Sequence, residues 1–300
     1  MRSKDTDPVN HERGLGRRPR KSHPEFDGTA LYEYPTHLRH AIEDLPSLPG
    51  VYTFHGEERD LPLYIGKSIN IRSRVLSHLR TPDEARLLRQ TRRISCVRTA
   101  GEIGALLLEA HLIKTMLPLH NQRLRRSRQL FAWQIKDGAP ELVNAKDVKF
   151  GQEAGLFGLY ASRHSAMGQL RDLADTHGLC YGVLGLEKVS NGRPCFRAQL
   201  KQCLGACCGR ESVESHQHRL EAAMRDLNVV CWPYTGAVAL IERLEDMEDI
   251  HIVQNWCYLG SVKTLPEAKA LGAVHANFDA DSYRILCRPI VQASVEIVRL

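Results

Sequence analysis

The chain has 300 residues, of which 25% are charged and 43% are hydrophobic, enough apolar material for about two ordinary domains. This composition excludes collagen-like, coiled-coil and wholly disordered chains. No run of eighteen apolar residues is present, and the N-terminus lacks the apolar core of a signal peptide. We therefore expect a cytoplasmic protein with no membrane partner.

Positive charge is concentrated in the first 130 residues, which carry 23 Lys and Arg against 15 Asp and Glu. The remaining 170 carry 18 against 20. A basic half suggests a nucleic acid as partner, because focused positive potential attracts phosphate backbones; a solvated basic surface is the alternative. Residues 1–27 hold seven Lys and Arg but almost no large apolar residue, which predicts a flexible basic arm or a simple spacer.

The first half of the chain alternates short β-rich runs with helical patterns. In chain order we expect a helix at 36–45, a hairpin of strands 50–54 and 63–66, a helix at 70–80, a short helix after Pro82, a strand at 94–99, an amphipathic helix at 102–117 and a strand at 130–135. This order predicts a compact α+β domain over residues 28–145, with a central antiparallel sheet flanked by helices.

The second half begins with a predicted helix at 165–177. After it come a cysteine-rich segment at 180–208, a helix at 212–227 and β-rich runs at 236–241, 250–258 and 282–286. These patterns predict a helical, cysteine-containing region at 146–230 and a β-rich C-terminal module at 231–300.

Chemically useful side chains gather between residues 50 and 121. Tyr52 and Tyr64 fall on adjacent predicted strands, and Gly66 and Lys67 follow at an expected tight turn. Glu109 lies at the edge of an apolar helical stripe, where a carboxylate costs free energy unless it is paired or binds a metal.

An arginine, a histidine and an amide complete this set. Arg74 and His78 are four residues apart on one helical face, and Asn121 follows the helix break at Pro118. Together these residue types suit metal-assisted attack on a phosphodiester. Singly, each also fits a structural role as a core aromatic or a solvated charge.

The combination of motifs is more specific than its parts. Gly50-Val51-Tyr52, Tyr64-Ile65-Gly66-Lys67-Ser68 and Asn70-x-Arg72-x-Arg74 resemble the signature of the GIY-YIG nuclease superfamily. The run at 105–114 and the segment at 117–121 resemble the N-terminal half of the repair endonuclease UvrC in particular. The resemblance covers residues 45–135 and returns at the cysteine-rich segment.

The resemblance implies a role for each matching residue. Glu109 would bind one divalent cation, Mg²⁺ or Mn²⁺, and Tyr52 would help to activate the attacking water. Arg74 would pair with the scissile phosphate, which Tyr64 and Lys67 would orient and neutralise. Asn121 would close the site. His78 is a candidate proton carrier at a position where UvrC sequences have tyrosine or phenylalanine. Four arginines would contact the DNA: Arg72, Arg123, Arg125 and Arg126.

Five of the nine cysteines fall between residues 180 and 208. Cys180, Cys195, Cys203 and Cys207 offer four thiolates, with Cys208 in excess, which favours zinc or an iron–sulfur cluster. The resemblance to UvrC implies a [4Fe–4S] cluster, with zinc second and unliganded thiols a third possibility. The remaining cysteines are expected in the core, in strand-like contexts: Cys96, Cys231, Cys257 and Cys287.

No second nuclease signature and no helix-hairpin-helix motif follow residue 230. In this respect the chain resembles the stand-alone UvrC homologues of the Cho family. The resemblance implies a single incision on the 3′ side of a lesion in double-stranded DNA, made in a complex with UvrB after UvrA has acted. The alternatives are a non-catalytic DNA-binding or scaffold protein that retains the fold, and a free-standing structure-specific nuclease.

Overall fold

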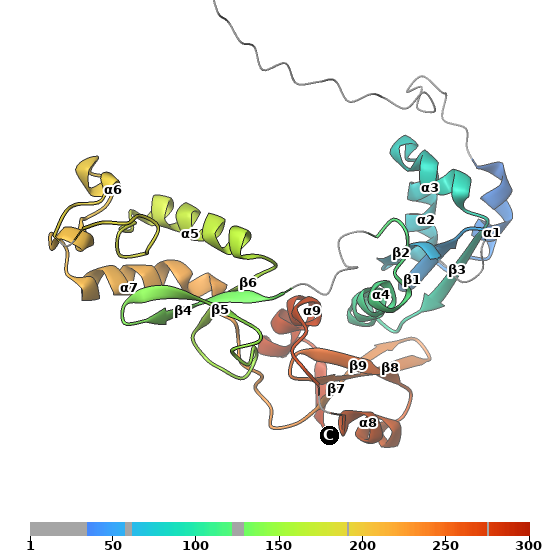
Figure 1. The fold of residues 1–300 in the computed structure, drawn as a ribbon. Coiled ribbons are helices and arrows are strands. Elements are labelled where there is room, and N and C mark those ends of the chain that lie inside the picture. The colour runs from blue at the N-terminus through green and yellow to red at the C-terminus, as the bar shows by residue number, and fades with distance from the viewer. Residues whose placement is uncertain (1–34, 58–61, 122–128, 191, 275) are drawn as a thin grey trace, which may run out of the picture. The chain divides into compact units, whose positions relative to one another are not determined.

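The computed structural model describes residues 35–57, 62–121, 129–190, 192–274 and 276–300 (Figure 1). The expected basic arm at 1–27 and the arginines Arg123, Arg125 and Arg126 lie outside these described residues. The chain divides into two units, 1–34 and 35–300, and the second contains all the described residues. Within the described ranges, no helix is both long and apolar enough to cross a bilayer.

Over the described residues the fold is mixed α/β, with three antiparallel sheets. From edge to edge, the first sheet contains β2 (Pro62–Ser68), β1 (Gly50–His55) and β3 (Arg93–Arg98). The second contains β5 (Ala139–Asn144), β4 (Phe131–Lys136) and β6 (Leu156–Tyr160), and the third contains β10 (Glu296–Arg299), β7 (Val238–Leu244), β8 (Met247–Gln254) and β9 (Cys257–Val262). Because each sheet is formed by consecutive segments of the chain, apart from the last strand, local pairing explains most of the topology.

The first sheet and its helices contain all the elements expected between residues 36 and 117. They are η1 (Thr36–Leu38), α1 (Arg39–Glu43), β1 (Gly50–His55), β2 (Pro62–Ser68), α2 (Ile71–Leu79), η2 (Pro82–Glu84), α3 (Ala85–Gln90), β3 (Arg93–Arg98) and α4 (Glu102–Met116). The central strand β1 is buried along its whole length. One face of the sheet packs through Val51 and Ile65 against Ile113 of α4.

The second sheet belongs to a region with helices α5 and α7. Its elements are β4 (Phe131–Lys136), β5 (Ala139–Asn144), β6 (Leu156–Tyr160), α5 (Arg163–His177), α6 (Phe196–Gln199), η3 (Ala206–Cys208), α7 (Val213–Met224) and η4 (Arg225–Leu227). Trp133 of β4 shares a core with Leu170 and Leu220 from the two long helices. Figure 1 shows α5 and α7 running along this sheet.

The predicted strand at 130–135 forms, but it pairs with β5 and β6 and not with the first sheet. The cause is local: Asp137 and Gly138 both have positive φ, as the two-residue turn of a tight hairpin requires. A boundary at residue 145 therefore divides this sheet.

The C-terminal region is a four-stranded sheet with two helices. It comprises β7 (Val238–Leu244), β8 (Met247–Gln254), β9 (Cys257–Val262), α8 (Leu265–Gly272), α9 (Ala280–Val291) and β10 (Glu296–Arg299). The predicted strand at 282–286 is wrong, because these residues lie in α9. Asp279 caps that helix by accepting a hydrogen bond from the Ser282 amide at 3.1 Å.

The burial pattern of α9 explains the correction. Tyr283, Leu286 and Ile290 are buried and lie three and four residues apart, which is a helical period. Cys287 accordingly lies in a helix and not in a strand. The four isolated cysteines are partly exposed, so the expectation that they are core residues is met only in part.

Candidate active site

Strands β1 and β2 place three aromatic rings on one face of the first sheet. Their antiparallel register sets Tyr52 opposite Gly66 and Phe54 opposite Tyr64. Opposed residues share a face, and so do residues two apart on one strand, so these side chains all point the same way. The ring centroid of Tyr52 lies 6.2 Å from that of Tyr64.

Gly66 lies inside β2, so the expectation of a tight turn at this glycine is wrong. The structure gives another reason for the residue. A Cβ atom at position 66 would lie 2.4 Å from the Tyr52 hydroxyl and 2.6 Å from its Cζ atom. The Tyr52 ring therefore crosses the strand where only glycine leaves room for it.

Helix α2 brings two more candidate residues to this face. Asn70 caps the helix, since its Oδ1 accepts a hydrogen bond from the Ser73 amide at 2.9 Å. His78, one turn beyond Arg74, is 3% exposed, and its Nε2 lies 2.6 Å from the Tyr52 hydroxyl. Arg74 is exposed and interacts with the same hydroxyl.

The environment favours the neutral forms of these groups. Burial, with Tyr64 as neighbour, raises the pKa of Tyr52 far above that of a free phenol, although Arg74 opposes the shift. Burial also raises the pKa of Tyr64. Burial lowers the pKa of His78, against the opposing effect of Glu84. At neutral pH the site therefore contains a phenol hydrogen-bonded to an uncharged imidazole.

Two more candidates, Asn121 and Glu109, contact the outer edge of β2. Ile65 and Lys67 are two residues apart on an edge strand, so their amides point the same way, away from β1. Asn121 Oδ1 accepts from the Ile65 amide at 2.9 Å, and its Nδ2 donates to the Ile65 carbonyl at 2.8 Å. Glu109 Oε1 accepts from the Lys67 amide at 3.0 Å.

These contacts refine two expectations. Asn121 uses both ends of its amide on the Ile65 backbone, so it fixes the strand edge. Lys67 lies in the strand and not at a turn, and its ammonium donates to Glu102 Oε1 at 2.7 Å. Glu109 is half-buried, and burial raises the pKa of its carboxyl while the Lys67 amide and the charges of Lys67 and Arg74 oppose that shift.

Sequence patterns gave no indication of a carboxylate that contacts His78. Glu84, in η2, lies within hydrogen-bond distance of His78 Nδ1. A short spacing could have revealed this contact: η2 begins three residues after α2 ends. A residue in such a turn can reach back to the last turn of the helix.

A second unexpected group holds the helix that carries Glu109. The N-terminus of α4 lacks a side-chain cap of its own. Glu242 of β7 accepts hydrogen bonds from the amides of Ile103 at 3.1 Å and Gly104 at 2.7 Å. Its Oε2 also lies 3.0 Å from His251 Nε2. The C-terminal region thus supplies the anion that the positive end of α4 favours.

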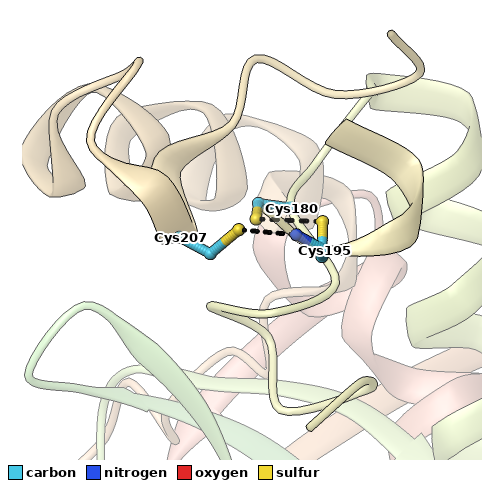
Figure 2. A group of neighbouring side chains, drawn as sticks. All are labelled: Cys180, Cys195 and Cys207. Atoms are coloured by element: carbon cyan, nitrogen blue, oxygen red, sulfur yellow. Dashed lines mark hydrogen bonds between the residues drawn. The ribbon is translucent and has the colours of Figure 1, made fainter. Parts of the chain in front are cut away.

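The cysteine cluster is separate from this site and lies among α6, η3 and the adjoining loops. The Sγ atoms of Cys180, Cys195 and Cys207 all lie within 4.8 Å of one another (Figure 2). Cys203 Sγ is 3.8 Å from Cys195 Sγ, which is also 3.8 Å from Cys180 Sγ. Three of the four predicted ligands therefore form one group, and the fourth, Cys203, lies beside Cys195. Cys208 instead directs its thiol to the Gly205 carbonyl.

Three family models match consecutive parts of the chain. A UvrC-like GIY-YIG domain matches residues 48–122, the middle domain of UvrC and Cho excinucleases matches 130–226, and the C-terminal domain of excinuclease Cho matches 237–300. Fold and motif together define a nuclease of the GIY-YIG class, with the domain order of the UvrC-type excision-repair enzymes.

Curated relatives narrow the family further. Excinuclease Cho of Escherichia coli K12 is 57% identical over 276 residues, which cover 92% of this chain and 94% of the relative. The Salmonella typhimurium enzyme is 56% identical over the same shares. The chain belongs to the excinuclease Cho family and is a nuclease of excision repair. This membership removes support for a non-catalytic scaffold.

Several solved structures of a UvrC GIY-YIG domain also match the first domain. The magnesium-bound GIY-YIG domain of UvrC from Thermotoga maritima is 32% identical and covers 28% of this chain and 94% of that chain. The TM-score is 0.26, which is too low to support an inference about this protein.

Proposed function

We propose that this excinuclease makes one incision on the 3′ side of a DNA lesion, in a UvrB–DNA complex prepared by UvrA, by divalent-cation-dependent hydrolysis. The observation that carries the chemistry is the convergence of Tyr52, His78 and Arg74 on one face of the sheet, with Glu109 at its edge. This set combines a proton relay, a phosphate-binding cation and a ligand for a metal.

Glu109 is the residue that would hold the cation. Its Oε1 accepts from the Lys67 amide, and among the described residues no hydrogen bond occupies Oε2. A carboxylate supplemented by water suits Mg²⁺ or Mn²⁺, and a cation would offset the burial that raises the pKa of Glu109. When bound, the cation would supply Lewis acidity to a phosphate oxygen.

Tyr52 is the group proposed to take a proton from the attacking water. Because burial keeps its pKa high, the phenol can accept that proton only as its own O–H proton leaves. His78 Nε2, 2.6 Å away, is the acceptor. The water oxygen forms a bond to phosphorus, one P–O ester bond breaks, and the departing oxygen takes a proton from solvent.

Arg74 and Lys67 are proposed to neutralise the phosphate. The planar guanidinium of Arg74 is exposed beside Tyr52 and can bind two phosphate oxygens at once. The side chain of Lys67 is 29% exposed, and its ammonium pairs with Glu102. Arg72, also exposed on α2, would contact a neighbouring phosphate without entering the reaction.

Targeting is proposed to come from UvrB. A net charge of +8 over residues 1–130 supports only sequence-independent attraction to DNA, so a lesion-bound partner must supply the position of the cut. The near-neutral half at 146–300 offers the surface for that partner.

The test is cleavage of an end-labelled duplex with one lesion, with and without UvrA, UvrB and Mg²⁺, with Glu109→Gln as the inactive control. We expect one cut at a fixed distance on the 3′ side and none on the 5′ side. If the protein cuts at the same position and rate without UvrB, the free-standing nuclease becomes the better assignment. An additional 5′ cut would contradict the proposed single incision.

We also propose that Cys180, Cys195 and Cys207, with Cys203 beside them, hold a metal centre. Sulfur atoms around one tetrahedral ion with bonds of about 2.3 Å stand about 3.8 Å apart, which is the separation on either side of Cys195. These two distances fit a single ion such as zinc, held by Cys180, Cys195 and Cys207, which all lie within 4.8 Å of one another; Cys203 would have to approach the group to become the fourth ligand. The [4Fe–4S] cluster implied by the UvrC resemblance would need wider spacing, because each thiolate binds a different iron.

Metal analysis of the purified protein separates these possibilities. One zinc per chain, without visible charge-transfer absorbance, is the result expected from the geometry. Iron with an equal amount of inorganic sulfide would restore the iron–sulfur assignment. Protein free of both metals after anaerobic purification would contradict a metal centre.

A further inference from the structure

Both ring nitrogens of His78 have partners. Nε2 lies 2.6 Å from the Tyr52 hydroxyl, and Nδ1 contacts Glu84 Oε2. An ionised carboxylate can only accept a hydrogen bond, so Nδ1 must carry the proton. In the neutral ring Nε2 is then an acceptor, and the Tyr52 hydroxyl donates to it.

We propose that Glu84 is a positioning residue that fixes this tautomer of His78 and stabilises the imidazolium formed when His78 takes the Tyr52 proton. The inference rests on the proposed function, which assigns the proton relay to Tyr52 and His78. It adds a third member whose part in the reaction is exerted entirely through the histidine.

The charges around His78 show why a counter-ion is needed. The titratable or charged groups that face it are Tyr52 on β1, Tyr64 on β2, Arg74 on its own helix and Glu84 on η2. Two are neutral phenols and one is a cation, which disfavours a second positive charge. Among the described residues, Glu84 is the group here that can offset an imidazolium.

Burial strengthens this requirement. His78 is 3% exposed and packs against the rings of Tyr52, Phe54 and Tyr64, each with its centroid 5.4 Å away. An unpaired cation in such surroundings is strongly disfavoured, because burial removes its hydration. The Glu84 side chain is 32% exposed, so it keeps contact with solvent while it pairs with the buried ring.

Every proton that moves in this relay has a donor and an acceptor. The water loses a proton to the Tyr52 oxygen as it bonds to phosphorus, and the Tyr52 O–H proton moves to His78 Nε2. The resulting imidazolium keeps its Nδ1–H on Glu84, and it returns one proton through Tyr52 to solvent after the product leaves. No step requires Glu84 to change its own protonation state.

The local fold presents Glu84 to His78. The Thr81 amide donates to the His78 carbonyl, and the Glu84 amide donates to the Thr81 carbonyl, both at 3.1 Å, so the chain turns back on α2. Asp83 precedes Glu84 in the same short helix and is exposed. Asp83→Asn is therefore a matched control that removes the same charge without touching His78.

Single-turnover cleavage, measured from pH 5 to pH 9 in the lesion assay above, tests the kinetic part. Glu84→Gln should lower the plateau rate by about 10²-fold, the scale of general-base catalysis, without weakening DNA binding. It should also move the acid limb to lower pH, because removal of the carboxylate lowers the pKa of His78 and leaves the ring neutral over a wider range. Asp83→Asn should do neither.

A double-mutant comparison separates positioning from a general structural effect. In the His78→Phe background, Glu84→Gln should cause no further loss of rate, because the imidazole through which Glu84 acts is absent. The proposal would be overturned if Glu84→Gln lowered the cleavage rate as much in the His78→Phe background as in the wild type. It would also be overturned if Glu84→Gln alone kept the plateau rate and the acid limb of the wild type.

Nitrogen NMR of His78 gives a readout that does not depend on activity. The wild type should show the Nδ1–H tautomer, and Glu84→Ala should show a substantial Nε2–H population; unchanged tautomers would contradict the positioning role. If the wild type makes no cut although the tautomer changes as expected, the proposed function fails and the positioning role stands. Urea unfolding confirms that each variant compared is folded.

Discussion

Replacement of Gly66 by alanine tests whether the site depends on the passage of Tyr52 across β2. The added Cβ would stand 2.4 Å from the Tyr52 hydroxyl, 2.6 Å from its Cζ and 2.9 Å from Tyr64 Cε1. Tyr52 is 1% exposed and is held between Phe54, Tyr64 and His78, so its ring cannot move aside freely.

The magnitude follows from two opposing effects. Overpacking of a filled core costs about 1–3 kcal/mol, whereas exchange of glycine for alanine returns about 0.4–1 kcal/mol by restricting the unfolded chain. We expect the free energy of unfolding of Gly66→Ala to fall by about 1–2 kcal/mol. The cleavage rate should fall further, by about 10²-fold, because a displacement of the Tyr52 hydroxyl near 1 Å disrupts the reacting geometry.

Urea denaturation and single-turnover cleavage measure the two effects. Gly168→Ala is the matched control: this glycine lies inside α5, and an added Cβ would meet nothing within 4 Å. That variant should gain about 0.5–1 kcal/mol and cleave normally. The reasoning is refuted if Gly66→Ala unfolds and cleaves as the wild type does.

Three further predictions concern the metal ligand, the phosphate-binding cation and the anion that holds α4. Glu109→Gln should reduce cleavage on the order of 10³-fold with an unchanged circular dichroism spectrum, since it removes the proposed metal ligand from the edge of the core; near-normal cutting would contradict that role. Arg74→Ala should lower the single-turnover rate by about 10²-fold with little change in DNA affinity. Arg72→Ala should leave the rate intact and reduce by about one the slope of the logarithm of DNA affinity against the logarithm of salt concentration. The reverse pattern would exchange the roles of the two arginines. Despite burial, His251 and the α4 amides hold the pKa of the Glu242 carboxyl below its usual range. Ionised Glu242 therefore adds to the free energy of unfolding at any pH above the pKa that this carboxyl has in the unfolded chain. That stabilisation is lost as the pH falls through the pKa that the carboxyl has in the folded protein. Glu242→Gln should therefore cost about 1–3 kcal/mol at pH 7, and the difference from wild type in urea unfolding should shrink below about pH 4. The exposed Glu245→Gln should show no such change, and a pH-independent loss in Glu242→Gln would rule out the charge as the cause.

The local sequence determined much of the first domain. The hairpin, the helix with Arg74 and His78, and the amphipathic helix with Glu109 all form where their patterns predict, because periodicity and helix-ending prolines act over a few residues. The cysteine spacing likewise predicted a set of thiols that the fold brings together.

Two local signals were present but outweighed by other patterns. The Asp137-Gly138 pair marks the hairpin that joins β4 to β5, and Asp279 caps the helix that was predicted as a strand at 282–286. In that segment a short apolar run fits a strand or a buried helix equally well until the helical spacing over the longer stretch to Ile290 is counted.

Only the tertiary structure decided which groups complete the site. Glu84 contacts His78 because the chain turns back after α2, and Glu242 reaches the α4 amides from a strand about 140 positions away. Gly66 is required by the Tyr52 ring and not by a turn. A sequence pattern records the period of an element and where it ends, whereas contacts between side chains on different elements depend on register and packing, which are fixed only when the whole core forms.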